Sequence, residues 1–153
     1  MTHAVSDSVV LFAVGDLNLA LKIEAVERVE RSVEIAPLPE AMRGVLGVVN
    51  MRGRIMPVFD LRARFGMPEQ QVRASDYLVI ARMRSNPAAL LVNAVLDVVP
   101  GTEARITQSS EVLPDMECIS GVMKLDGDLV FVHDLERFLS NEDYAALQLA
   151  LSH

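Results

Sequence analysis

Short apolar runs separated by turn residues recur along the chain and predict a protein built from β-strands. The runs cover residues 9–14, 19–23, 45–51, 55–61, 77–81, 89–92, 121–125 and 129–132. Neighbouring runs are joined by segments that contain Gly, Asp, Asn or Pro, which is typical of hairpin turns. Pro57 lacks the backbone N–H that a sheet requires, so we expect it at a sheet edge or at the start of a strand. Short strands at this spacing favour small barrels.

Two copies of one unit follow each other in the chain. Residues 6–29 align with residues 75–98 without a gap, and residues 47–65 align with residues 121–139 after a short insertion. Two matching blocks in the same order indicate an internal duplication. Because a unit of about 70 residues is only marginally stable alone, we expect two subdomains that share an apolar interface.

The duplication places these subdomains at about residues 6–74 and 75–140. A short helix is predicted after them at residues 141–151, because Ser140 suits an N-cap and the apolar side chains that follow fall on one helical face. The predicted fold class is therefore mainly β, with two related barrels and a C-terminal helix that docks against one of them.

Both copies end their last hairpin with an Asp-Leu pair, at Asp60 and at Asp134. Asp is favoured where a chain enters a turn or helix, because its carboxylate accepts hydrogen bonds from the first free N–H groups. We interpret both aspartates as caps rather than as catalytic carboxylates.

The two copies differ most at the tips of these hairpins. The first copy has Arg52-Gly53-Arg54, whereas the second has Asp126-Gly127-Asp128. Both tips could be merely solvated, or they could pair with each other, although an exposed pair contributes only ~0–1 kcal/mol. Alternatively, the first tip binds a partner, because the planar arginine fork can hold a carboxylate through two hydrogen bonds. We expect Arg62 and Arg64, just beyond this hairpin, to flank a turn on a solvated basic face.

Composition and charge exclude several function classes. The 153 residues carry a net charge of −7, which disfavours nucleic acid as a partner. No apolar run reaches the ~20 residues that span a bilayer, so we expect no membrane insertion and a cytoplasmic protein. Cys118 is the only cysteine, so an internal disulfide is impossible.

The sequence offers no constellation of residues for catalysis. The histidines are His3, His133 and His153, and no second histidine cluster completes a metal site. His133 takes the place of Phe59 in the duplication, so we expect a partly buried strand residue there. A phosphate-binding glycine loop is also missing. We therefore expect no enzyme, no catalytic residues, no metal and no cofactor.

The segment GVLGVVNMRGRIMPVFDLRARFG, residues 44–66, resembles the signature of CheW-like domains. Other segments along nearly the whole chain resemble the family's strands in the same order. The resemblance implies two SH3-like five-stranded β-barrels, with a terminal strand that can be exchanged between them. It also implies a cofactor-free scaffold at receptor arrays, whose partners are the regulatory domain of a CheA-type histidine kinase and the cytoplasmic tip of a methyl-accepting chemoreceptor.

The resemblance also implies a partner-binding site on the first copy. Its residues are Asn50, Arg52, Gly53, Arg54, Val26, Arg28 and Val29. Arg28 departs from the family pattern, because an acid usually stands there to pair with the hairpin arginine. Either Glu27 or Glu30 takes over that pairing, or the surface suits a more acidic partner. Asn93 is a second departure, at a place where the family usually has Asp.

Three hypotheses follow for the function. The first is a non-enzymatic adaptor that couples chemoreceptors to the kinase. The alternative is a CheW-fold module with changed partners, through self-association or in a chemosensory pathway for pili or second messengers; Arg28 and unpaired strand edges favour it. The third is a small-ligand binder that uses a groove between the barrels.

Overall fold

Strands account for most of the regular structure in the computed structural model. It describes residues 8–37, 45–64, 67–68, 71–83, 86–100, 106–108, 119–125 and 127–133. The strands are β1 (Val9–Val14), β2 (Leu17–Lys22), β3 (Val26–Arg31), β4 (Val45–Met51), β5 (Arg54–Asp60), β6 (Tyr77–Met83), β7 (Asn86–Val92), β8 (Ala94–Val99), β9 (Ile106–Gln108), β10 (Ile119–Leu125) and β11 (Asp128–His133). Two short helical segments accompany them, η1 (Ile23–Ala25) and α1 (Leu61–Arg64). The mainly β fold class is confirmed, and all eight apolar runs form strands, whereas the helix predicted at residues 141–151 lies outside the described residues.

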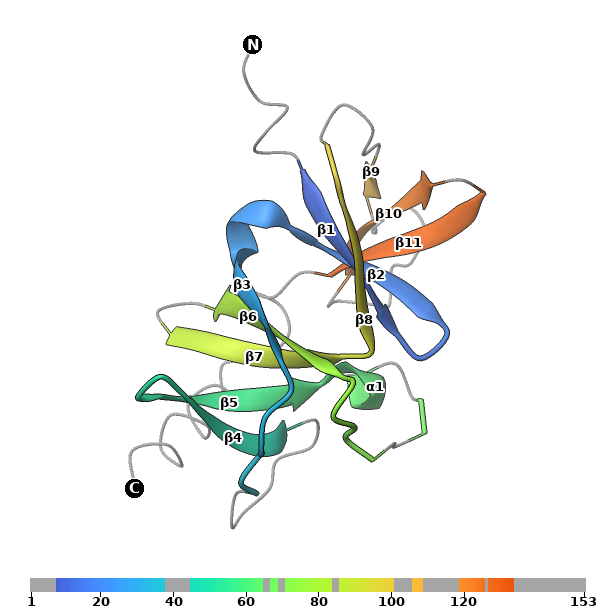
Figure 1. Ribbon diagram of the computed structural model, residues 1–153. Coiled ribbons are helices and arrows are strands. Elements are labelled where there is room, and N and C mark those ends of the chain that lie inside the picture. Colours follow the sequence, from blue (N-terminus) through green and yellow to red (C-terminus); the bar gives the residue numbers. More distant parts are fainter. Residues whose placement is uncertain are drawn as a thin grey trace.

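The strands form two separate sheets (Figure 1). Barrel A has the strand order β8-β1-β2-β11-β10-β9, and barrel B has the order β3-β6-β7-β5-β4. The chain passes from A to B through η1, which joins β2 to β3, and it returns to A where β7 leads into β8. The two passages lie at opposite ends of β1, where the Ile23 N–H donates to the carbonyl oxygen of Ser8 and the Asn93 N–H donates to that of Ala13.

The barrels do not coincide with the two sequence repeats at residues 6–74 and 75–140. Barrel B takes all its strands from residues 26–92, whereas barrel A combines β1 and β2 with the strands from β8 onward. Each repeat therefore lends its opening hairpin to the barrel of the other repeat. The resemblance implied exchange of a terminal strand, and the exchanged element is instead a two-stranded hairpin.

Each sheet closes on itself through the segment that follows its edge strand. After β3, Ala36 exchanges two backbone hydrogen bonds with Val48 of β4, at 2.9 and 2.8 Å. After β8, Thr107 of β9 pairs with Val122 of β10. Val48 and Val122 are equivalent in the duplication, so β9 is the counterpart of the single bridge at Ala36. Barrel A is thus a six-stranded sheet and barrel B a five-stranded one, and β9 takes in A the place that Ala36 takes in B.

The bulges of the sheets repeat as well. The register of β4 against β5 shifts between Val45 and Gly47, and that of β10 against β11 shifts between Ile119 and Gly121. Gly47 has φ +153°, and a Cβ atom there would collide with the carbonyl oxygen of Ala36. Glycine is needed at this position because the closing segment of the barrel crosses directly over it.

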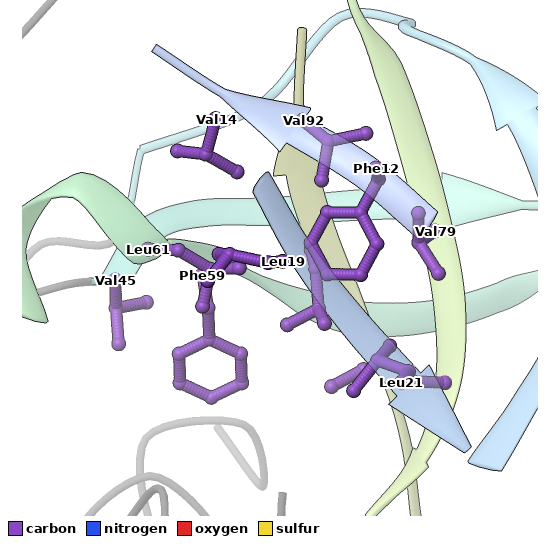
Figure 2. Close-up of a cluster of buried hydrophobic side chains, with 12 residues drawn as sticks. Phe12, Val14, Leu19, Leu21, Val45, Phe59, Leu61, Val79 and Val92 are labelled. Carbon is purple, nitrogen blue, oxygen red and sulfur yellow. The ribbon is translucent and has the colours of Figure 1, made fainter. Parts of the chain in front are cut away.

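Three apolar clusters hold the fold together. The largest lies between the barrels, where Phe12 and Leu19 from β1 and β2 face Phe59, Val79 and Val92 from barrel B (Figure 2). The other two fill the barrels, one around Met56, Leu78 and Ile80 in barrel B and one around Leu11, Met123 and Val130 in barrel A. The predicted apolar interface between the two units is therefore present.

Pro57 lies inside β5, between β4 and β7, and not at an edge or a strand start as expected. Its partner Val48 uses both backbone groups on Ala36, so Pro57 faces a non-hydrogen-bonded position of β4. On its other side, the pairing of β5 with β7 begins only at Val58. The missing N–H of Pro57 therefore leaves no ladder position unfilled, which is why a central strand tolerates it.

Candidate functional site

The tip of the β4–β5 hairpin is a two-residue turn formed by Arg52 and Gly53. Their φ angles are +57° and +88°, as in a type I′ turn, whose twist matches that of the flanking strands. The side-chain oxygen of Asn50 accepts a hydrogen bond from the Gly53 N–H at 2.9 Å. Asn50 and Gly53 therefore shape the turn, while Arg52 extends from it with 75% of its side chain exposed.

An arginine is an unusual choice for this backbone conformation. The left-handed region costs residues other than glycine about 1 kcal/mol, and Asn, Asp or Gly normally fills it. Gly127 of the second hairpin has the same φ of +88°, and there the preceding residue is an aspartate. Both hairpins thus have a glycine with the same φ at this place, and the residue before it in the sequence is a cation in the first hairpin and an acid in the second.

Edge strand β3 meets this hairpin through a chain of ion pairs, which we call the arginine cluster. Arg54 Nη1 lies 3.1 Å from Glu27 Oε2, and Arg52 Nη2 lies 3.4 Å from Glu30 Oε2. Arg28 joins the two carboxylates, with Nε 2.7 Å from Glu30 Oε2 and Nη1 3.6 Å from Glu27 Oε2. Both glutamates therefore take over the pairing that the family pattern assigns to an acid at position 28.

Arg28 is on the face of β3 that lies toward the barrel B core. In the register of β3 against β6, Arg28 is opposite Ile80 and Glu30 is opposite Leu78, and both partners belong to the buried core of that barrel. The stem of Arg28 is accordingly half-buried. Its Nη2 atom is buried and has no hydrogen-bond partner among the described residues.

The two apolar residues of the predicted site, Val26 and Val29, differ in exposure. Val26 is half-buried and packs against the cluster between the barrels, so it anchors β3 more than it offers surface. Val29 is exposed, and Ile55, which the sequence reasoning missed, is 57% exposed beside Arg54. The alternation of Ile55 with buried Met56 along β5 was the available signal, since it turns Ile55 away from the core. Asn50, Arg52, Gly53 and Arg54 thus meet Arg28 at the hairpin tip. Val29 points to the opposite face of β3, the side of Val79 in the cluster between the barrels.

Arg62 corrects an expectation, because it lies in the interior with only 2% of its surface exposed, not on a solvated face. Its Nη2 atom donates to the side-chain oxygen of Asn93 at 2.9 Å, and Nη1 lies 3.8 Å from Asp60. Asp60 also accepts a hydrogen bond from the Arg62 backbone N–H at 3.0 Å, which confirms its predicted role as a cap. The side chain of Arg64 lies outside the described residues.

Asn93, which is half-buried, is the centre of this network, which we call the junction network. It lies between β7 and β8, where the chain passes from barrel B to barrel A. Its oxygen also accepts from the Gly15 N–H of the β1–β2 turn at 2.6 Å, and its amide donates to Asp76 at 3.2 Å. The network therefore ties the two barrels together, and the departure at Asn93 supplies the donor that buried Asp76 needs.

Within the described residues, no three His, Cys, Asp or Glu side chains gather where they could hold a metal ion. His133 lies in β11, opposite Ile119, as Phe59 lies opposite Val45. Among the described helices, none has the length and apolar character needed to cross a membrane.

Comparison with known proteins agrees with this architecture. The family model of the CheW-like domain matches residues 8–143. The chain belongs to the CheW-like domain family. It is 29% identical over 139 residues to the chemotaxis protein CheW of Rhizobium meliloti, with 90% of each chain covered. It is also 29% identical over 133 residues to the chemotaxis protein CheW of Thermotoga maritima, with 86% of each chain covered.

A solved structure of the family shares the fold. The scaffolding protein TtCheW from Thermoanaerobacter tengcongensis superimposes with a TM-score of 0.78 at 28% sequence identity. The match covers 89% of this chain and 94% of that chain. The resemblance seen in residues 44–66 is therefore confirmed over most of the CheW-like chain.

Proposed function

We propose that the protein is a non-enzymatic adaptor that couples chemoreceptors to a CheA-type histidine kinase. In this proposal it acts in the cytoplasm, where it binds the cytoplasmic tip of a methyl-accepting chemoreceptor and the regulatory domain of the kinase. Membership of the CheW-like family and the similarity to a scaffolding protein support the adaptor role. No covalent step is needed, because an adaptor works by holding its partners in place.

The placement of Arg52 carries the proposal of a partner-binding site. A turn that serves only the fold would be more stable with Asn or Gly at this position, because Arg52 has φ +57°. An exposed ion pair such as that with Glu30 contributes at most about 1 kcal/mol, which does not clearly offset the strain. Strained residues cluster where function requires them, so we assign Arg52 a contact with a partner.

The other residues of the site have supporting roles in this proposal. Asn50 and Gly53 hold the turn, Arg54 and Arg28 continue the cationic surface onto β3, and Val29 adds apolar contact area. Val26 holds β3 against the apolar cluster between the barrels. Interface energy is typically concentrated in a few central residues, among which arginine is enriched.

The test is a binding titration of the full chain against the kinase regulatory domain and against the receptor tip. We expect micromolar affinity, about −8 kcal/mol, for the wild type. Arg52→Glu should weaken binding to at least one partner about tenfold or more, because the tip then repels the carboxylates it attracted. Lys124→Glu is the matched control, since it makes the same charge change at an exposed position of β10.

Two results would contradict the proposal at different levels. If the wild type binds neither partner, the adaptor function is wrong. If the wild type binds and Arg52→Glu binds equally well, the adaptor function stands and Arg52 is not part of the site.

A further inference from the structure

The β1–β2 turn of barrel A is held by two side chains from the junction of the barrels. In this turn Gly15 has φ +58°, and its N–H donates to the side-chain oxygen of Asn93 at 2.6 Å. A Cβ atom at Gly15 would collide with the terminal methyl group of Met67, and the Met67 sulfur lies 3.8 Å from that Cβ position. The thioether of Met67 therefore lies directly against the turn.

Met67 is itself tied to the junction network. Its N–H donates to the carbonyl oxygen of Arg62 at 2.9 Å, just after α1. The side chain of the same Arg62 donates to Asn93 at 2.9 Å. Asn93 and Met67, which both contact Gly15, are thus both hydrogen-bonded to Arg62. A change in the Met67 side chain therefore acts at the place where the turn of barrel A meets barrel B.

Exposure distinguishes Met67 from the other methionines whose side chains the structure describes. Met67 is half-buried. Met51, Met56 and Met123 lie in the barrel cores, with 6%, 0% and 2% of their surfaces exposed. Oxidation of a thioether requires that the oxidant reach the sulfur, so among these four residues Met67 reacts first.

We propose that Met67 is a site of reversible oxidation by a peroxide, and that its sulfoxide releases the β1–β2 turn from the junction of the barrels. With hydrogen peroxide, the sulfur lone pair attacks one oxygen, an S–O bond forms and the O–O bond breaks. The departing hydroxide takes the proton of the transferred oxygen and becomes water. Sulfur loses two electrons and the peroxide gains them, so no catalytic residue or further reactant is needed.

The sulfoxide replaces an apolar contact with a polar one. Its oxygen is a hydrogen-bond acceptor, and burying such a group without a donor is unfavourable. Because Met67 is half-buried, its oxidised side chain reaches water by moving away from Gly15. The turn then loses its apolar cover, and water competes for the hydrogen bond between Gly15 and Asn93. The inference goes beyond the proposed adaptor function and does not depend on it.

The experiment exposes the full chain and its Met67→Leu variant to hydrogen peroxide and follows each methionine by peptide mass spectrometry. Leu fills a similar apolar volume without a sulfur atom, which makes this variant the matched control. In the wild type, we expect the sulfoxide of Met67 to form about tenfold faster than those of Met51, Met56 and Met123. Cys118 and the other methionines are present in both proteins, so their reactions affect both alike.

Two further measurements report on the turn. Oxidation should lower the melting temperature of the wild type by about 3 °C or more, and it should accelerate hydrogen exchange in the peptide that contains Gly15. Met67→Leu should show neither change after the same treatment. A methionine sulfoxide reductase should restore both properties of the wild type, and this reversal tests the proposal even if Met67→Leu does not fold.

Three results would overturn the proposal. If Met67 is oxidised no faster than the buried methionines, it is not a preferred site. If its sulfoxide forms and hydrogen exchange at Gly15 is unchanged, the turn does not depend on the thioether. If peroxide destabilises Met67→Leu as much as the wild type, the damage lies elsewhere in the chain. None of these results bears on the adaptor function, which is tested separately by binding.

Discussion

The arginines of one short stretch end in opposite environments. Arg52 and Arg54 lie at an exposed hairpin tip and pair with carboxylates of β3. Arg62 follows soon after in the sequence, yet it is buried and hydrogen-bonded to Asn93 at the junction of the barrels. Exposed pairs contribute ~0–1 kcal/mol, whereas a buried charge left without its partners costs several kcal/mol. The arginine cluster is therefore free to serve recognition, and the junction network serves the fold.

The largest effect on stability is expected for Arg62, the buried arginine. Arg62→Met should lower the free energy of unfolding by about 3 kcal/mol or more, because buried Asp60 and half-buried Asn93 lose the group that they bind. Urea denaturation followed by circular dichroism measures the loss. Arg62→Lys should lose part of the same stability, since it keeps the charge without the planar fork. A stability change below about 0.5 kcal/mol for Arg62→Met would remove the distinction between the two arginine regions.

A smaller effect is expected from the neutral member of the junction network. Asn93→Asp should cost about 1–2 kcal/mol at neutral pH, because Asp76 loses its donor and faces a second carboxylate. The double variant Asn93→Asp with Asp76→Asn should recover most of that loss, since it restores a donor and an acceptor in exchanged positions. Denaturation midpoints of the single and double variants measure the loss of stability and its recovery. If the single and the double variant were equally unstable, the Asn93–Asp76 hydrogen bond would not account for the stability lost in Asn93→Asp.

At the exposed hairpin tip, a substitution of Arg52 should raise stability and weaken binding. Arg52→Asn should raise the free energy of unfolding by about 0.5–1 kcal/mol, because Asn tolerates the left-handed φ of this turn better. The same variant should bind the kinase or receptor partner more weakly, since it lacks the cation. Thermal melts and binding titrations on one preparation test both parts. A variant that is more stable and binds equally well would show that Arg52 has no role in recognition.

The smallest effect is expected for the ion pair between Arg54 and Glu27. Glu27→Gln should change the free energy of unfolding by no more than about 0.5 kcal/mol at moderate salt, because exposed pairs are weak and screened. Chemical denaturation at low and high salt provides the measurement. A loss above about 1 kcal/mol would mean that the arginine cluster stabilises barrel B in the way the junction network stabilises the contact between barrels.

The candidate site was largely predictable because its signals are local. The turn at Arg52-Gly53, the supporting Asn50 and the contrast with the second hairpin all follow from neighbouring residues. The exposed Ile55 was missed, although its alternation with buried Met56 pointed to it. Arg62 was misplaced, because an arginine after a hairpin is usually solvated and only a long-range partner, Asn93, reveals that it is buried.

The sequence by itself determined the strands, their turns and the duplication, because alternation and turn chemistry depend on residues close together in the chain. It also determined where the two copies differ, and so which hairpin carries cations. Only the tertiary structure decided that the opening hairpins are exchanged between barrels, that Glu27 and Glu30 both pair with the arginines, and that Arg62 is buried. These outcomes depend on which strand lies beside which. That choice is made by apolar side chains far apart in sequence, such as Phe12 and Phe59, which meet only when both barrels have formed (Figure 2).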